Sequence, residues 1–192
     1  MPFPPPAKIN GIRAVSVPGQ HSAQVFNTQT LQAGVISSVS LTRPSNTTAY
    51  TAGDVIGIAD AGTQANAGSA ILEFTEVGNA GRLIKIASST FQVNLASVPA
   101  SMTSFKLHLY NASPTAILDK AAFDLVSGDR TKYLGSVDIG TPADLGSTLF
   151  SQNEAINKLV KLVTTSLYGV IETAGGYTPA SGTGMTITLI TG

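Results

Sequence analysis

The sequence predicts an all-β protein, with a jelly-roll-like antiparallel β-sandwich as the favoured architecture. Three observations lead to this fold class. Apolar and polar residues alternate with a period of two in many short segments, which is the spacing of the two faces of a strand. Clusters of Gly, Pro, Asn, Asp and Ser separate these segments. Only 11% of the 192 residues are charged, so the helix formers Glu and Lys are scarce.

The expected strands follow one another along most of the chain. The clearest alternation begins at Phe91, Phe105 and Met185, each of which starts an inward apolar row. Together with weaker patterns, these rows place strands, in chain order, at residues 8–17, 25–27, 38–42, 54–58, 70–76, 83–87, 91–95, 105–110, 133–139, 167–173 and 184–189. About ten strands separated by turns are typical of a sandwich or barrel.

Two segments fit this pattern less well. In residues 153–165 the apolar positions recur at the helical spacing i, i+3, i+4 and i+7. The same segment is rich in β-branched residues and runs directly into an expected strand, so a strand is favoured over a helix. Residues 121–125 are expected to form a short helical turn, which Gly128 ends.

The stretch 41–57 is interpreted as a connection between two strands. We expect one strand to end at Thr42, Pro44 to stop ladder pairing, and the next strand to begin at Val55. Turn chemistry explains its proline and glycines, and the stretch requires no chemical function.

Two parts are expected along the chain: an extended arm at residues 1–8 and a single β-sandwich domain at residues 9–192. The arm is expected because the chain begins MPFPPP, and closely spaced prolines favour polyproline II and cannot donate to a sheet. An unstructured tail is the alternative for these residues. The sharper interpretation is an arm that lies along a neighbouring subunit.

Charge and composition argue against several classes of protein. The formal net charge is zero and no basic cluster occurs, so direct binding to nucleic acid is not expected. There is no cysteine, which excludes disulfides and thiolate metal sites. Neither a secretory leader nor an apolar run of 18 residues is found, so we expect a soluble, unsecreted chain without membrane contact. Zero net charge also favours self-association.

The sequence offers little for catalysis, and we expect no enzyme activity, cofactor or metal. Its two histidines, His21 and His108, are far apart, and His108 is expected to face outward from a strand with Lys106 and Tyr110. The four aspartates that lie closest together lack the order of a calcium-binding loop: Asp119, Asp124, Asp129 and Asp138. The common motifs of acyl transfer, zinc hydrolysis and phosphate binding are also absent. A hydrolase with paired carboxylates remains an alternative, because two such groups suffice for glycoside cleavage.

A resemblance to a known group of proteins is carried by three runs. These are TRPSNTTAYTAGDVIG at residues 42–57, SFKLHLYNASPTAILDKAAFDLVSGDRTKYLGSVDIGTPADLGSTLF at 104–150 and LYGVIETAGGYTPASGTGMTITL at 167–189. The chain resembles small structural proteins of tailed-bacteriophage virions over residues 35–190. The resemblance implies a head decoration or cement protein that has a jelly-roll-like body and binds the major capsid protein. It also implies location in the virion, after assembly in the host cytoplasm.

The shared phrases mark turns, so no functional residue is carried over from the resemblance. From composition and strand position we expect a homo-oligomer whose candidate interface residues are Phe3, Pro4, Pro5, Pro6, His108 and Tyr110. The alternative is a tail- or neck-associated module that recognises a glycan through the Gly- and Ser-rich loops at 61–69 and 172–184. The scarcity of aromatic residues argues against that alternative.

Overall fold

The computed structural model describes residues 8–9, 12–15, 24–26, 34–58 and 71–192. Internal packing divides the chain into two units, Met1–Ala33 and Gly34–Gly192. In the first unit three short strands form an antiparallel sheet in the order β1 (Lys8–Ile9), β2 (Ile12–Val15) and β3 (Gln24–Phe26). The prolines of the expected arm lie outside the described residues, so the arm and its boundary at residue 8 stay predictions.

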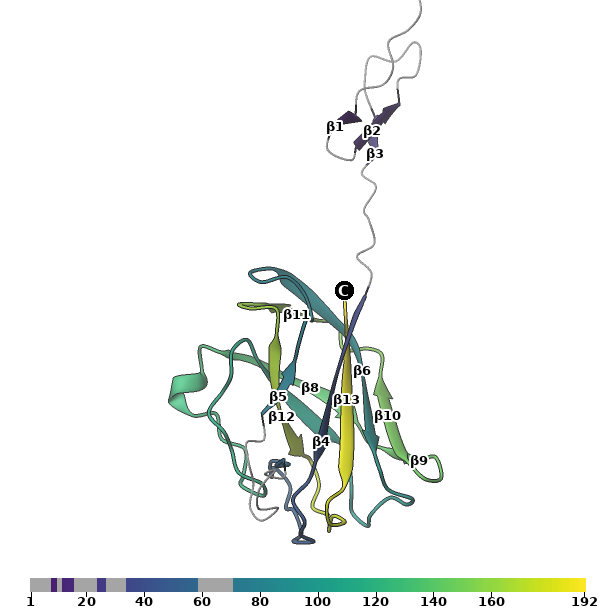
Figure 1. Cartoon of the computed structure of the whole chain (residues 1–192), viewed down its shortest axis with the longest axis vertical. Helices are drawn as coiled ribbons and strands as arrows, with labels where there is room; N and C mark the ends of the chain where they lie inside the picture. Colours follow the sequence, from purple (N-terminus) through teal and green to yellow (C-terminus); the bar gives the residue numbers. More distant parts are fainter. Residues whose placement is uncertain (1–7, 10–11, 16–23, 27–33, 59–70) are drawn as a thin grey trace, which may run out of the picture. The chain divides into compact units, whose positions relative to one another are not determined.

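Two antiparallel sheets make up the second unit, here called the body (Figure 1). Neighbouring strands of the larger sheet are, in order, β4 (Val35–Thr42), β13 (Gly184–Thr191), β6 (Leu83–Val93), β10 (Leu149–Asn153) and β9 (Ala143–Asp144). Its sixth strand, β11 (Lys158–Lys161), pairs with the first part of β6. The smaller sheet has the order β5 (Leu72–Phe74), β12 (Leu167–Thr173), β7 (Phe105–Tyr110) and β8 (Tyr133–Gly140). The expected all-β class is thus confirmed.

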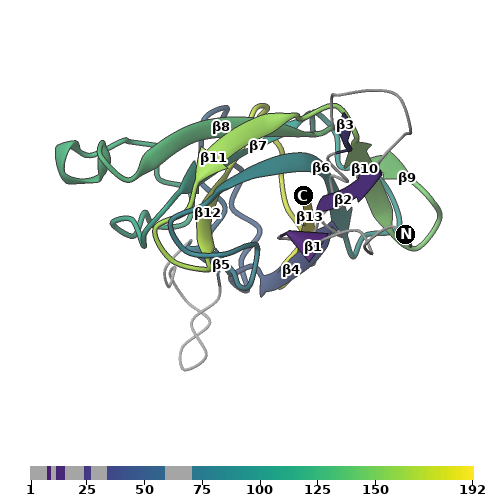
Figure 2. The same cartoon turned by 90° about the horizontal axis from the view of Figure 1, so that it is seen from above.

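The facing sides of the two sheets share one hydrophobic core. Figure 2 shows β6, β13 and β4 on one side of the body and β8, β7 and β12 on the other. Along β13 every second residue is buried, as the alternating sequence pattern predicts. The ring of Phe91 from the larger sheet meets that of Phe105 from the smaller sheet edge-on at 5.0 Å, and both are fully buried.

Some strands differ from their expected bounds. The strands expected at 83–87 and 91–95 are one strand, β6, because the intervening residues Ser88–Thr90 continue the pairing with β13. The strand expected at 54–58 is reduced to single bridges at Asp54 and Val55. Strand β10 was not expected, because a polar residue, the buried Ser151, interrupts its row of apolar residues. The Ser151 hydroxyl donates to the carbonyl of Ile139 at 2.7 Å.

Helical structure is almost absent from the described residues. The segment 153–165 contains the strand β11, which confirms the preference for a strand over a helix. The helical turn expected at 121–125 is wrong: the only helix of the described part is the 3₁₀ turn η1 (Ser127–Asp129). Residues 121–123 are held instead by pairing with 53–55, where Val55 N–H donates to the Ala121 carbonyl and Phe123 N–H to that of Gly53. Nowhere in the described part is a helix long and apolar enough to cross a membrane.

A buried polar cluster joins three connections at one end of the body. Arg43, which follows β4, is fully buried, and its Nε donates to the Tyr50 hydroxyl at 2.5 Å. That hydroxyl donates to Oδ1 of Asp119 at 2.6 Å, and Nη2 of Arg43 lies 3.6 Å from Oδ2 of the same carboxylate. Arg43 Nη1 also donates to the carbonyl of Ala180 at 3.0 Å. Strand β4 does end at Thr42 as expected, but the stretch after it anchors this cluster, which the sequence pattern did not reveal.

We expect Asp119→Ala to destabilise the body by about 3–5 kcal/mol, because it leaves the buried Arg43 guanidinium without its carboxylate. Asp124→Ala is the matched control, since Asp124 is exposed, and its cost should be within about 0.5 kcal/mol. Equilibrium unfolding in urea measures both. Equal stabilities of the two variants would show that the cluster does not stabilise the fold.

Candidate interaction surface

The outer face of the larger sheet is uncharged over β4, β13 and the second part of β6. No charged residue occurs in β4, in β13 or in β6 from Ile86 to Val93. Pairing register aligns the outward side chains in rows across these strands. One row consists of Ser38, Thr188 and Thr90, and the next of Ser40, Thr186 and Gln92. We call these six residues the hydroxyl face.

Cross-strand hydrogen bonds hold part of the hydroxyl face in place. The hydroxyls of Ser38 and Thr188 lie 2.8 Å apart, and those of Ser40 and Thr186 lie 2.9 Å apart. Threonine is also stiff at χ1, so these side chains have little freedom left to lose when a partner binds. Since interface centres are depleted in charge, the hydroxyl face shares this one property with docking surfaces.

Exposed apolar side chains lie toward the end of the same sheet, where β4 and β6 begin. Ile36, Leu83 and Leu159 are 68%, 69% and 67% exposed. Ile36 is paired across β4 and β13 with Ile190, and Leu159 lies opposite Lys85 across β11 and β6. These side chains add apolar area beside the hydroxyl face, where a partner could cover them.

Part of the outer face of the smaller sheet is covered. Residues 111–132 connect β7 to β8, and together with 53–55 they form a second apolar cluster over that sheet. Val55, Tyr110 and Val170 form its fully buried centre. Farther along the same face Lys106, Ser136 and Asp138 remain exposed. Within the described part of the body, no comparable apolar connection covers the larger sheet.

This cover corrects the expectation that His108 and Tyr110 face outward. Both alternate away from the shared core, as expected, but they are only 5% and 1% exposed. The ring of Phe123 stacks on the His108 ring at 3.5 Å between centroids. A sequence pattern identifies the face on which a residue lies, but it does not show that a distant connection returns to cover that face. Phe3, Pro4, Pro5 and Pro6 lie outside the described residues.

Beneath the cover, His108 takes part in a polar network. Its Nε2 lies 2.5 Å from Oε2 of Glu172, and its Nδ1 lies 3.0 Å from the Tyr133 hydroxyl. Nζ of Lys106 lies 3.5 Å from the other oxygen of Glu172. Burial lowers the pKa of His108 below its ordinary value of 6.5; the hydrogen bond and charge of Glu172 act in the opposite direction but do not offset it.

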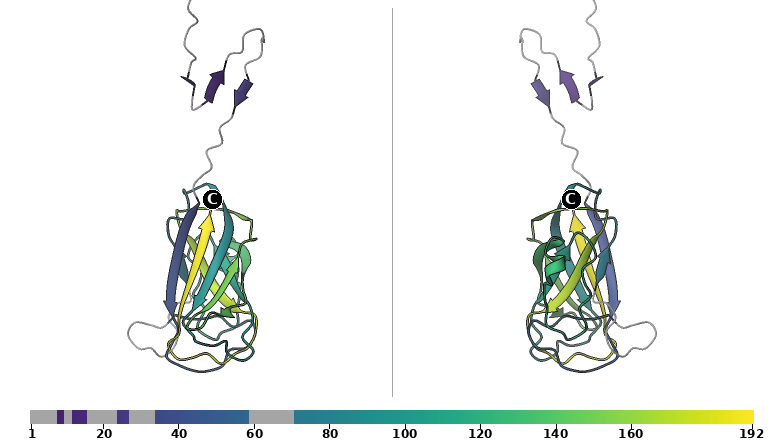
Figure 3. Two further views of the ribbon diagram at one scale, coloured as in Figure 1. Left: turned by 90° about the vertical axis from the view of Figure 1, so that its right-hand side faces the viewer. Right: turned by 90° about the vertical axis from the view of Figure 1, so that its left-hand side faces the viewer.

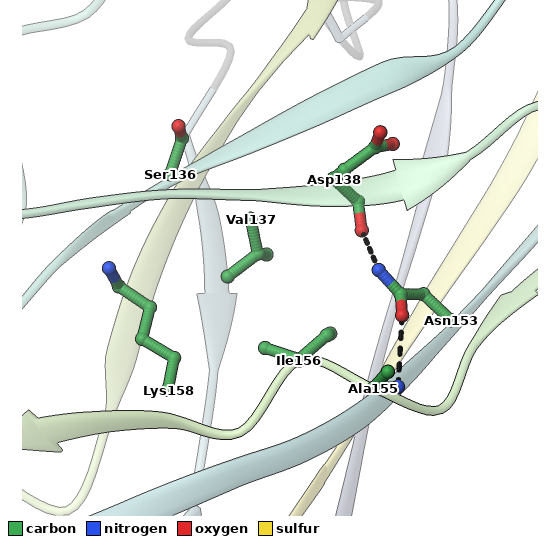
Figure 4. A pocket seen from close by; sticks show the side chains of 7 residues that line it. All are labelled: Ser136, Val137, Asp138, Asn153, Ala155, Ile156 and Lys158. Carbon is green, nitrogen blue, oxygen red and sulfur yellow. Dashed lines mark hydrogen bonds between the residues drawn. The ribbon is translucent and has the colours of Figure 1, made fainter.

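A shallow pocket of about 380 Å³ lies between β8 and the segment that joins β10 to β11 (Figure 4). The Asn153 amide spans it, donating to the Asp138 carbonyl at 2.7 Å and accepting from the Ala155 N–H at 3.0 Å. Oδ1 of Asp138 accepts from the N–H of Gly140. Several polar groups of the pocket are therefore already used by the protein itself.

The aspartates singled out in the sequence do not converge. Asp119 belongs to the Arg43 cluster, whereas Asp129 accepts from the Thr115 N–H at 2.7 Å and from Lys132 Nζ at 2.8 Å. The hydrogen bond from Lys132, with the smaller contribution of the Thr115 N–H, holds the pKa of Asp129 below its usual range. Within the described ranges, no group of three or more His, Asp or Glu side chains could hold a metal ion.

The loop at 172–184, a candidate for glycan recognition, is packed against the body. Its one aromatic side chain, Tyr177, is 3% exposed and lies 5.2 Å from the Tyr50 ring. It therefore offers no aromatic platform on which a sugar could stack. The other candidate loop, 61–69, lies outside the described residues.

Comparison with models of protein families and with curated proteins found no match to this chain. The function must therefore be inferred from the body itself. Its most distinctive surface feature is the contrast between the covered part of the smaller sheet and the open, uncharged hydroxyl face of the larger one.

We expect His108→Gln to reduce the loss of stability on acidification. The folded pKa of His108 is lowered, so the unfolded chain takes up its proton first as the pH falls through about 6.5, and stability is lost below that pH. Urea unfolding of both proteins at pH 7.5 and pH 5.5 measures the difference, and His21 is common to both. A wild-type protein that loses no more stability than the variant would contradict the assignment.

Proposed function

We propose that this chain is a non-enzymatic structural protein of a tailed-bacteriophage virion, a decoration or cement protein that binds the major capsid protein lattice. The observation that carries the proposal is the hydroxyl face: an open, ordered and uncharged sheet surface on a body whose other sheet is partly covered by an apolar connection. The choice of the major capsid protein as the partner is supported by the resemblance of residues 35–190 to small virion proteins. Location in the virion, after assembly in the host cytoplasm, belongs to the same proposal.

The strand order supports a jelly-roll-like β-sandwich as the architecture. Four strands of the larger sheet follow the order β4-β13-β6-β10, and the smaller sheet follows β5-β12-β7-β8. Along the chain these eight strands alternate between the sheets, except for the pair β7 and β8, which are neighbours in one sheet. A jelly roll, with its two Greek keys and eight strands, has this arrangement.

The expected mode of binding follows from the chemistry of the open face. Hydroxyl and amide groups can replace their hydrogen bonds to water with hydrogen bonds to the backbone and polar side chains of a capsid protein. No charged group of the hydroxyl face has to lose its hydration in this exchange. The proposed arm, with Phe3, Pro4, Pro5 and Pro6, would add contacts to a neighbouring subunit. His108 and Tyr110 are not part of this proposed surface, because the cover buries them.

Thr188→Lys should weaken binding to undecorated phage heads at least about tenfold, since it places an unpaired charge in the centre of the hydroxyl face. Ala116→Lys is the matched control, because Ala116 is exposed on the segment that covers the other sheet. Co-sedimentation with heads measures both variants. If Thr188→Lys decorates as tightly as the control, the hydroxyl face is not the capsid-binding surface.

Deletion of residues 2–7 should weaken attachment to heads while leaving the unfolding transition of the body unchanged, because the body forms a unit of its own from Gly34 onward. The same sedimentation assay and a thermal melt give the two readouts. Undiminished attachment would remove the arm from the proposal.

The position of the protein in a cryo-electron microscopy map of intact virions tests the proposal as a whole. Density on the capsid lattice is the expected result. Density at the tail or neck, together with binding on a glycan array, would favour the alternative of a glycan-recognising module.

A further inference from the structure

The strand β4 forms one lateral border of the larger sheet, with β13 on its inner side (Figure 3, left panel, where β4 is dark blue and β13 yellow). The N–H of Arg43 donates to the carbonyl of Thr183, which fixes the phase of the β4–β13 ladder. Odd-numbered residues of β4 therefore bond to β13. The backbone N–H and C=O groups of Ile36, Ser38, Ser40 and Thr42 point to the open side, and no described residue pairs with them.

The other lateral borders of the two sheets carry features that oppose pairing with a further strand. β9 has only two residues, one of which is Asp144, and β5 has three, with Glu73 exposed among them. The ladder of β8 is irregular at two points, and its Gly135 and Gly140 have a φ of +89°. Short length, charge and irregularity are the usual means by which proteins block edge-to-edge association.

β4 has none of these features. It is eight residues long, with the sequence VISSVSLT, and contains no charge, proline or glycine. Its ladder with β13 runs without a register shift from Val35 to Thr42. A long, regular and uncharged edge strand is a template for strand addition.

We propose that β4 pairs with β4 of a second copy of this chain, antiparallel, so that Ser38 lies opposite Ser40 of the second copy and Ile36 opposite Thr42. Antiparallel pairing about a twofold axis makes one edge its own partner. Neither β4 nor its neighbour β13 carries a charge, so no like charges meet at the junction. This register, centred on Val39, is the one that pairs all four open residues within β4.

Such pairing has a direct consequence for the hydroxyl face. The residues paired across the junction all lie on the outer side of the sheet, so the twofold axis places the hydroxyl faces of both copies on the same side. The dimer would present one continuous uncharged surface of twice the area. The inference assigns to β4 the contact of the homo-oligomer expected from the sequence, and it can be tested without a capsid. Only the relevance of this dimer to head binding rests on the proposed function.

Sedimentation velocity over a range of micromolar concentrations tests the proposal, with the wild-type chain expected to be a dimer. Ser38→Pro should yield a monomer, because it removes an N–H that faces the open edge and leaves the β13 ladder intact. Ser40→Lys should weaken dimerisation roughly fivefold or more, since the two lysines would lie diagonally across the junction. The double variant S38E/S40K should restore the dimer, because each glutamate then lies opposite a lysine of the second copy.

The matched control is Thr186→Lys, which adds the same charge to the same face one strand inward and should remain dimeric. A wild-type chain that is monomeric at all concentrations overturns the proposal, as does a dimer that persists in both Ser38→Pro and Ser40→Lys. Failure of S38E/S40K to recover the dimer overturns the register. If the dimer forms as expected but does not bind heads, only the capsid assignment is refuted. If the wild-type chain is a monomer and Ser38→Pro abolishes its binding to heads, the edge of β4 pairs with a strand of another protein instead.

Discussion

The packing of the two inner sheet faces against each other is the interaction on which the rest of the body depends. Side chains alternate along every strand, so the shared core buries one face of each sheet and leaves the opposite face exposed unless another segment covers it. The edge-on contact of Phe91 with Phe105 joins the two inner faces. The surface that the body offers to a partner then depends on which of the two outer faces is covered.

The two outer faces are treated differently. The connection from β7 to β8 returns over the smaller sheet and buries Tyr110 and Val170 in a second apolar cluster. Across the body, the larger sheet presents serine and threonine hydroxyls that bond to each other across strands. A surface of this kind is solvated without charge, and its hydroxyls cost less free energy to remove from water than charged groups would, which suits a protein that acts by contact.

The Arg43 cluster shows how the body holds its irregular end in place. A guanidinium that is fully buried must be paired, and Asp119 and Tyr50 supply the carboxylate and hydroxyl for this purpose. Asp119 also accepts from the N–H of Gly57, so one carboxylate orients both the arginine and a backbone turn. The cluster connects segments that are far apart in sequence. It therefore holds long connections in place that make no backbone pairing with a strand.

The sequence by itself determined the all-β class, the inward rows that begin at Phe91, Phe105 and Met185, and the end of β4 at Thr42, because alternation and turn residues are local signals. Strand identity in 153–165 was also predictable from its β-branched residues. Only the tertiary structure decided the sheet order, the burial of His108 and Tyr110, the pairing of Arg43 with Asp119 and the open edge of β4. Each of these depends on which distant segments meet, and a period-two pattern shows that a residue lies on one face of a strand without showing what covers that face.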